Sequence, residues 1–207
     1  MQEIEAKFYV LDLKRIGTRL HELEARLIQA RVLETNIRFD LPDARLRSQG
    51  RVLRLRQDTE THLTYKGAGT SEQGVIDRTE IEFVVEDFEK AKSLLEALGY
   101  QKLLQYDKYR TTYELGNCHI MLDELPYGNF VEIEGENIAA IRAMADRLNL
   151  DPQAAIAKSY STLFDIACRR LGLTFTDLTF FNFKEIKVLP EHLQVRPADQ
   201  PLVPKHD

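Results

Sequence analysis

Charged and apolar residues alternate along many short stretches of this chain, beginning at its first residues. Glu3, Glu5 and Lys7 occupy every second position, with apolar residues between and beyond them. The side chains of a strand point alternately to its two faces, so these three share one face. The tripeptide Glu-Ile-Glu recurs at 80–82 and 132–134. The pattern predicts strands that have one charged face and one apolar face.

The same alternation predicts strands along most of the chain. Arg54 and Arg56 share a face, and so do Lys108 and Arg110. A segment rich in glycine, at 67–74, is typical of a hairpin connection and less specifically of a phosphate-binding loop. The expected strands are residues 2–10, 37–40, a segment ending at 56, 61–67, 75–85, 104–115, 118–125 and 130–135.

Apolar residues at helical spacing predict four helices. The first has Asp12 as its N-cap and carries Ile16, Leu20, Leu23 and Leu27 on one face. The other three are expected at about 86–100, from about 137, and after the Asp-Pro pair at 151–152 to about 172. These amphipathic helices can cover the apolar faces of the strands.

The end of the chain differs in composition from the rest. Four of the seven prolines lie in the last 18 residues. We therefore expect one domain over residues 1–173 and a C-terminal extension over 174–207 that is partly disordered, chiefly beyond about residue 185.

Bulk composition excludes several classes of protein. With 207 residues, 43% of them hydrophobic, the chain is long enough for one large domain. The net charge of -5 argues against general nucleic-acid binding, and two isolated cysteines argue against a disulfide framework or a zinc site. No apolar run approaches the roughly 18–20 residues of a membrane helix, and no signal peptide is recognisable. We expect a cytoplasmic protein without membrane or nucleic-acid partners.

The charged strand faces can point to one of two places. They can face water on an open sheet, or they can line the lumen of a closed antiparallel barrel whose helices pack outside. Two features favour the lumen. Charges of both signs come in tight pairs two residues apart, and most of these side chains are long enough to meet in a central channel.

A charged lumen would bring acidic and basic side chains together. Crowded carboxylates repel one another unless they hold a hard cation, and their oxygens suit Mg²⁺ or Mn²⁺. Arginine and lysine side chains suit a polyanion, because arginine forks match pairs of phosphate oxygens. This combination predicts a substrate such as tripolyphosphate or a nucleoside triphosphate.

Several short motifs, in order, resemble a known family. They are "EIEAK", "RLR", "TYK", "RTEIE", "KYR", "LDE", "VEIEG" and "KSYS", and they run from Glu3 to about Tyr160. The set resembles the CYTH domain, or triphosphate tunnel metalloenzymes. That family includes class IV adenylate cyclases, thiamine triphosphatases and inorganic triphosphatases. The resemblance implies an α+β fold, with an eight-stranded antiparallel closed β-barrel as the tunnel and helices packed outside.

The resemblance also implies roles for individual residues. Lys7, Glu5 and Glu134 are the expected catalytic residues, and Mg²⁺ or Mn²⁺ is the expected cofactor. The implied metal ligands are Glu3, Glu5, Asp123, Glu132 and Glu134. The implied triphosphate contacts are Lys7, Arg54, Arg56, Lys66, Lys108, Arg110 and Lys158. Arg78, Glu80 and Glu82 are expected to orient the cations of the tunnel, with metal binding as the second possible role of Glu80 and Glu82.

One position departs from the family pattern. Arg38 stands where family members often have a tyrosine, which in some hydrolytic members works with the lysine of the first motif. Arg38 could bind phosphate, or it could point out of the tunnel. The departure weakens a mechanism that depends on that tyrosine.

Three functions are compatible with such a site. The first is metal-dependent hydrolysis of tripolyphosphate, ATP or thiamine triphosphate. The second is an adenylate cyclase reaction that makes cyclic AMP and pyrophosphate, and the third is binding of triphosphate or polyphosphate without turnover. Cyclisation needs a purine pocket that the sequence does not reveal, so hydrolysis is favoured. A homodimer is one oligomeric state that the sequence allows.

Overall fold

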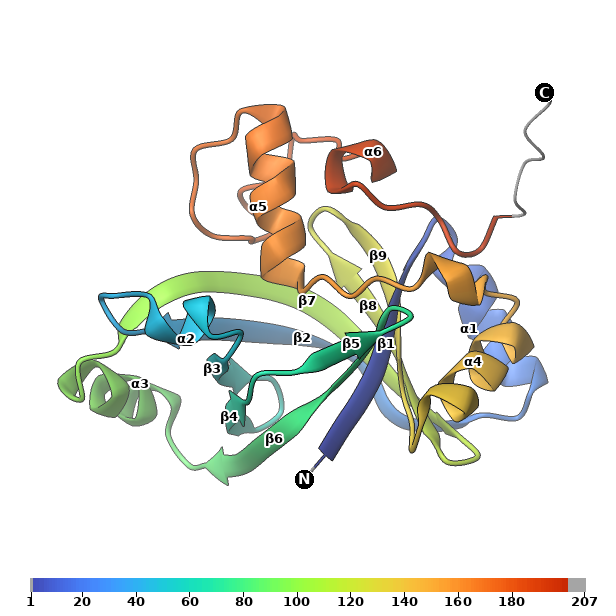
Figure 1. Cartoon of the computed structure of the whole chain (residues 1–207), viewed down its shortest axis with the longest axis horizontal. Coiled ribbons are helices and arrows are strands. Elements are labelled where there is room, and N and C mark those ends of the chain that lie inside the picture. Colours follow the sequence, from blue (N-terminus) through green and yellow to red (C-terminus); the bar gives the residue numbers. More distant parts are fainter. Residues whose placement is uncertain (1, 201–207) are drawn as a thin grey trace.

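The computed structural model describes residues 2–200, and within them eight antiparallel strands form a ring (Figure 1). They pair in the order β1, β9, β8, β7, β2, β3, β4, β6, and β6 pairs with β1 again. The short strand β5 adds to β6. The strands are β1 Gln2–Val10, β2 Arg26–Asp40, β3 Val52–Gln57, β4 Thr61–Lys66, β5 Thr70–Glu72, β6 Val75–Val85, β7 Gln101–Leu115, β8 Cys118–Leu125 and β9 Gly128–Glu134. The predicted α+β class and eight antiparallel strands are confirmed.

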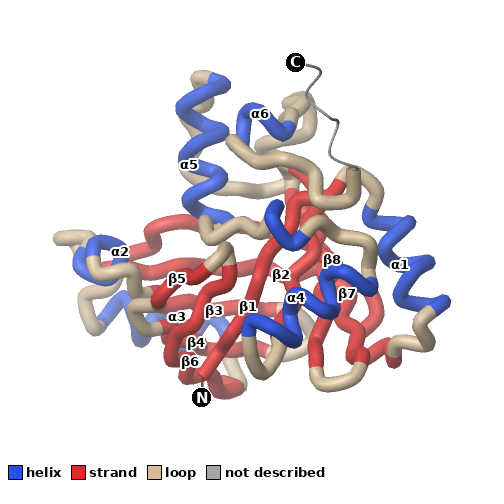
Figure 2. The backbone as a smooth tube through the Cα atoms, turned by 45° about the vertical axis from the view of Figure 1, so that its right-hand side comes forward, coloured by secondary structure: helices blue, strands red, loops and turns tan. Residues whose placement is uncertain are grey.

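Helices cover the ring from outside (Figure 2). They are α1 Leu13–Glu22, α2 Arg45–Ser48, α3 Phe88–Ala97, α4 Ile138–Arg147, α5 Tyr160–Leu171 and α6 Pro190–Leu193, with a 3₁₀ turn at Pro152–Ala154. In both views α1 and α4 lie on one side of the ring, α2 and α3 on another, and α5 and α6 beyond one end. None of the helices in the described part of the chain has both the length and the apolar character needed to cross a bilayer.

The first predicted helix forms but ends earlier than expected. Asp12 caps α1 by accepting a hydrogen bond from the Arg15 amide. The helix stops at Glu22, and Glu24 adopts a positive φ of 57° that turns the chain into β2. Leu27, expected on the helix face, is therefore a strand residue and is 52% exposed. Strand pairing with β7 outweighs the helical spacing of one leucine.

Three apolar clusters lie outside the ring. Under α1 and α4, residues such as Ile16, Ile133 and Ile141 pack on β1, β8 and β9. A second cluster joins α5 to the C-terminal segment, and a third packs α3 against β2 and β3. The apolar strand faces are used in these clusters, so the opposite faces, which carry the charges, line the interior of the ring.

The C-terminal segment is packed against the rest of the protein as far as residue 200. Leu193 is fully buried, and the Asp199 carboxylate accepts hydrogen bonds from the amides of Leu11 and Asp12. Leu178 donates to the Gln105 carbonyl at 2.8 Å. The expectation of disorder beyond residue 185 is wrong for 185–200, and 201–207 lie outside the described residues. The domain boundary at residue 173 stays a prediction.

Candidate functional site

The interior of the ring holds a cavity of about 210 Å³, which we call the inner chamber. It is lined by all the predicted site residues except Asp123 and Lys158, and also by Arg38 and Tyr106. The cationic lining residues are Lys7, Arg38, Arg54, Arg56, Lys66, Arg78, Lys108 and Arg110, and the acidic ones are Glu3, Glu5, Glu80, Glu82, Glu132 and Glu134. The predicted convergence of the charged strand faces is therefore present.

Strand register explains how these residues meet. Lys7 on β1 lies opposite Glu132 on β9, and Lys66 on β4 lies opposite Glu80 on β6. Opposite residues of an antiparallel pair point to the same side of the sheet. Strand register thus places Lys7 beside Glu132 and Lys66 beside Glu80 inside the ring, whereas Glu5 and Glu134 are like charges that lie opposite each other.

Lys7 lies at the centre of one group of ion pairs. Its Nζ is 2.8 Å from a Glu132 oxygen, and Arg110 also pairs with Glu132. Burial alone would raise the pKa of Glu132, but Lys7, Arg110 and Lys108 hold it well below its ordinary value. Lys7 and Glu132 are both buried, but their attraction outweighs the effect of burial, so the pair stays charged and fixes the ammonium of Lys7 in place.

Asp123 is fully buried behind these cations and does not line the chamber. It accepts hydrogen bonds from Lys108 at 3.0 Å and from Arg110 at 2.6 Å to each oxygen. The Tyr160 hydroxyl donates a further bond at 2.8 Å. In this arrangement Asp123 holds Lys108 and Arg110 toward the chamber. Its predicted role as a metal ligand stays a prediction.

Glu34 is a site residue that the sequence reasoning missed. It is 1% exposed and lies 3.4 Å from Lys108, with Arg110 and Arg56 within 4 Å. Burial raises its pKa, but Lys108, Arg110 and Arg56 outweigh burial and lower it to about 2. The signal was present in the sequence, because Glu34, Asn36 and Arg38 alternate along β2 in phase with the charged faces.

A second group of ion pairs lies around Glu3. One of its oxygens is 2.5 Å from Lys66, and the other is 2.8 Å from Arg78. Burial opposes ionisation, yet Lys66 and Arg78 lower the pKa of Glu3 to about 2. Glu80 lies 3.2 Å from Lys66, and burial together with Glu3 raises the pKa of Glu80 to about 7. Glu3 is thus the ionised partner and Glu80 the more readily protonated one.

Glu5 and Glu134 form the part of the chamber where negative charge is least compensated. They lie opposite each other on β1 and β9. Burial and the charges of Glu3 and Glu5 raise the pKa of Glu134. Glu5 pairs with Arg78 at 3.1 Å, whereas Glu134 has no hydrogen bond or ion pair with any residue in 2–200.

The chemistry of these carboxylates suits a divalent cation, but their present arrangement does not form a metal site. Crowded carboxylates with too little positive charge around them gain most from a hard cation that binds oxygen. Across residues 2–200, however, no three acidic, histidine or cysteine side chains are arranged as a ready metal site. Glu3 and Glu5 are held by Lys66 and Arg78 instead. Metal binding would therefore require these carboxylates to exchange partners.

Arg54 and Arg56 line another wall of the chamber. Glu82 pairs with both, at 3.4 and 3.3 Å, and accepts a 2.6 Å hydrogen bond from Thr64. The Nε of Arg54 is buried without a hydrogen-bond partner among the described residues, whereas the Nε of Arg56 lies 3.3 Å from an Asp58 oxygen. An unsatisfied buried donor is costly unless a ligand or water meets it. Arg54 is therefore suited to receive a phosphate oxygen.

Tyr160, the first residue of α5, is also absent from the predicted site. Lys7 Nζ lies 4.4 Å from the centre of its ring, and the ring lines the chamber. Ser159 caps α5 by accepting a hydrogen bond from the Thr162 amide, which fixes where the helix begins. Burial and Asp123 raise the pKa of Tyr160 well above its ordinary value, so its hydroxyl stays protonated.

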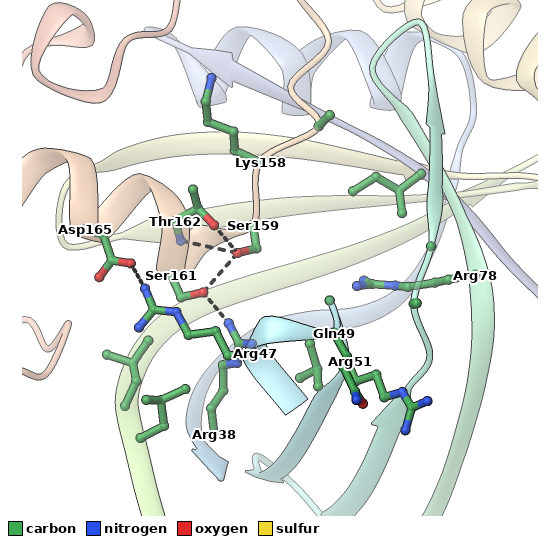
Figure 3. Close-up of a pocket in the computed structure, with 18 of the residues that line it drawn as sticks. Arg38, Arg47, Gln49, Arg51, Arg78, Lys158, Ser159, Ser161, Thr162 and Asp165 are labelled. Atoms are coloured by element: carbon green, nitrogen blue, oxygen red, sulfur yellow. Dashed lines mark hydrogen bonds and ion pairs between the residues drawn. The ribbon is translucent and has the colours of Figure 1, made fainter. Parts of the chain in front are cut away.

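Arg38 points into the ring and not out of it. It lines the inner chamber and donates a hydrogen bond to the Ser161 hydroxyl. Lys158 is exposed and lines a neighbouring cavity of about 510 Å³, which we call the outer cavity (Figure 3). The two cavities share Arg38, Val52, Ile76, Arg78, Ser159 and Ser161.

Such a chamber can bind a small polyanion and stabilise negative charge on it. Its cations come from at least six strands of the ring, so their positions are fixed by the sheet rather than by loops. Rigidly placed cations in a buried site are an effective means of stabilising a charged transition state. Together, the ring of eight antiparallel strands and its charged interior define the class of protein: an α+β fold whose strands enclose a charged cavity.

Comparison with known proteins identifies the family. A family model of the CYTH domain matches residues 1–158, so the chain belongs to the CYTH domain family. Adenylate cyclase CyaB of Aeromonas hydrophila is 28% identical over 174 residues, which cover 78% of this chain and 87% of that protein.

Two solved structures share the fold. The PH1012 protein of Pyrococcus horikoshii matches with a TM-score of 0.66 and 26% identity, over 76% of this chain and 96% of that one. HpAC1 of Hippeastrum, reported with a dominant triphosphatase activity, matches with a TM-score of 0.58 and 19% identity, over 94% and 100% of the two chains. The suspected membership of the family is confirmed.

Proposed function

We propose that this protein is a divalent-metal-dependent hydrolase that acts on the triphosphate moiety of inorganic or organic triphosphates. The observation that carries the proposal is the inner chamber, which is lined by eight cationic side chains and also by Glu134, whose carboxylate has no ion pair within residues 2–200. A chamber of about 210 Å³ is small for an organic ligand, since such sites usually exceed about 300 Å³. It suits the phosphate chain itself.

Binding would proceed by exchange of partners. Lys7, Lys66 and Arg78 are now paired with glutamates. The oxygens of a triphosphate carry more charge than one carboxylate and can take over these hydrogen bonds, in pairs at each arginine. The glutamates released by this exchange become available to a cation.

Mg²⁺ or Mn²⁺ would be held by Glu5 and Glu134, with Glu3 and Glu132 beside them. When bound, such an ion neutralises phosphate charge and lowers the pKa of a water molecule. Lys7, fixed between Glu132 and the Tyr160 ring, would donate to the phosphoryl group that is transferred. Arg54, Arg56, Lys108 and Arg110 would stabilise the charge that develops on its oxygens.

An adenylate cyclase is the second candidate. It is supported by the name of the Aeromonas hydrophila relative, which shares 28% identity with this chain. Cyclisation requires the ribose 3′-hydroxyl to attack the α-phosphorus, and hydrolysis requires water to attack the terminal one. The reported triphosphatase activity of HpAC1 belongs to a protein of 19% identity, and that likeness extends to the fold alone.

A substrate panel separates these functions. The protein is incubated with tripolyphosphate, ATP or thiamine triphosphate, with Mg²⁺ or Mn²⁺, and orthophosphate, pyrophosphate and cyclic AMP are measured. Metal-dependent release of orthophosphate supports the proposal. Cyclic AMP and pyrophosphate without orthophosphate would establish the cyclase instead, and tight binding without any product would establish a binding protein.

The metal assignment is tested by Glu5→Gln. We expect activity to fall at least about 10–100-fold, because one carboxylate of the cation site is lost. Glu124→Gln is the matched control, since Glu124 points to the outer face of β8 and pairs with Arg31. Full activity in Glu5→Gln would show that the metal site lies elsewhere.

A further inference from the structure

The outer cavity has a different charge balance from the inner chamber. Five cationic side chains line it: Arg38, Arg47, Arg51, Arg78 and Lys158. The acidic side chain in its lining is Asp165, which already pairs with Arg47 (Figure 3). Arg78 is neutralised by Glu3 and Glu5.

Three of these cations lack an acidic partner within residues 2–200. Arg38 bonds to the neutral hydroxyl of Ser161, while Arg51 and Lys158 have no ion pair there. Burial lowers the pKa of Arg38, and the positive charges of Arg47, Arg54 and Arg78 lower it further. The field in the outer cavity is therefore positive, whereas most cations of the inner chamber have an acidic partner nearby.

The remaining lining argues against an organic group in this cavity. Phe164 is the aromatic residue in the lining, and it is buried against Phe175 and Phe183. No ring there is free to stack on a base. The positive field would also repel the cationic ring of thiamine. The hydroxyls of Ser159, Ser161 and Thr162 instead offer donors to oxygen atoms.

The walls of the outer cavity are built from distant parts of the chain. One wall is the β5–β6 hairpin, and another is the segment 157–165 that leads into α5. Gly74, in the turn of the hairpin, lets the hairpin lie close to Ala155, just before this segment, since a Cβ on Gly74 would lie 2.6 Å from the Cβ of Ala155. The part of this wall from Ser159 to Asp165 lies beyond the match to the family model, which ends at residue 158.

We propose that the outer cavity binds phosphate groups that continue beyond the three held in the inner chamber, so that the preferred substrates are linear polyphosphates longer than tripolyphosphate. Because it takes the inner chamber as the site of the terminal triphosphate, this inference rests on the proposed function. The reaction keeps its form: water attacks the terminal phosphorus, the bond to the bridging oxygen breaks, and the shortened chain leaves with that electron pair.

The test compares binding of two anions without added metal. Dissociation constants for tripolyphosphate and for a polyphosphate several times longer are measured by calorimetry in the presence of EDTA. We expect the longer chain to bind about tenfold more tightly. Arg51→Glu should remove most of this difference in affinity and should weaken the binding of tripolyphosphate less. The reason is that Arg51 lines the outer cavity but not the inner chamber.

The matched control is Arg26→Glu, which makes the same charge change at the opposite end of β2 from Arg38. A long chain also binds more tightly because any of its phosphate segments can occupy the site. This statistical gain is equal in Arg51→Glu and Arg26→Glu, so the comparison between them removes it. The inference is overturned if Arg51→Glu weakens both anions equally or neither, or if ATP binds more tightly than the long chain and is insensitive to Arg51→Glu.

Orthophosphate release from tripolyphosphate, measured with metal on the same samples, separates the two proposals. If release is normal and the two variants bind the long chain alike, the inference fails and the proposed function stands. If no phosphate is released but the dependence on Arg51 is present, the proposed function fails and the outer cavity is still a polyphosphate site.

Discussion

Glu34 shows, at the scale of single residues, how the chamber keeps its cations in place. It lies behind Lys108, Arg110 and Arg56, and Asp123 does the same for Lys108 and Arg110 from β8. Removing one partner of a buried ion pair is costly because the remaining charges lose their compensation. These two carboxylates therefore hold the cations that would meet phosphate.

Glu34→Gln should lower the free energy of unfolding at neutral pH by on the order of 3 kcal/mol. The pKa of Glu34 is lowered from 4.5 to about 2 in the folded protein, because its cationic partners outweigh burial. A carboxylate with a lowered folded pKa stabilises the fold above its ordinary pKa, and this contribution is lost as the pH falls toward the folded pKa. The difference between wild type and variant should therefore shrink below about pH 4.5.

Urea denaturation at a series of pH values measures this difference. Glu96→Gln is the control, since Glu96 is exposed on α3 and should give a small change at every pH. A Glu34→Gln effect of equal size at neutral and acidic pH would show that the ion pairs are not its cause.

Tyr160→Phe tests a second residue that links Asp123 to the chamber. The variant keeps the ring against Lys7 but removes the hydroxyl that donates to Asp123. We expect a loss of about 1–3 kcal/mol in unfolding free energy, typical of a buried hydrogen bond to a charged group. Thermal denaturation measures the loss. Stability equal to that of wild type would mean that Lys108 and Arg110 alone satisfy Asp123.

There is a physical reason why the sequence predicts some residues of the site and misses others. Glu3, Glu5 and Lys7 were found because a period of two in a strand fixes the face directly. Tyr160 could not be found this way, since it begins a helix and reaches the chamber only because α5 packs across the end of the ring. Glu34 lay in a strand that was predicted too short, at 37–40 instead of 26–40.

At the scale of elements, the C-terminal segment completes the packing of α5. Leu163 and Phe164 of α5 lie in one buried cluster with Leu178, Phe183 and Leu193. Proline content suggested a loose tail, but proline also suits extended chain that packs without a ladder of hydrogen bonds. Composition alone could not distinguish these two outcomes.

Truncation tests this view of the segment. A chain of residues 1–173 should be less stable than a chain of residues 1–200, because the apolar face of α5 loses its cover. The removed contacts include several large side chains, each worth about 1.5–3 kcal/mol when fully buried. Thermal denaturation compares the two chains. Equal melting temperatures would support residues 1–173 as an independent domain.

At the scale of the whole molecule, the ring brings many charges of both signs together in its centre. Eight cationic and six acidic side chains line the chamber, and Glu34, Asp58 and Asp123 add acidic partners for its cations. An anion that enters this chamber takes lysine and arginine partners away from the carboxylates. A metal cation that enters reduces the repulsion among the carboxylates left without partners. Each ligand thus favours the other, and this coupling must be reciprocal.

Glu134→Gln should separate the two parts of that coupling. With EDTA, the variant should bind tripolyphosphate as tightly as wild type or more tightly, because one negative charge near the phosphates is gone. Wild type should gain affinity when Mg²⁺ is added, by about 5–150-fold, and the variant should lose most of this gain. Calorimetry measures the four dissociation constants, for each protein with and without Mg²⁺. Both proteins meet the same complex of Mg²⁺ and tripolyphosphate in solution, so the free energy of forming that complex cancels when the two proteins are compared. If Glu134→Gln weakens the anion without metal and keeps the full gain from Mg²⁺, then Glu134 supports phosphate binding and the cation lies elsewhere in the ring.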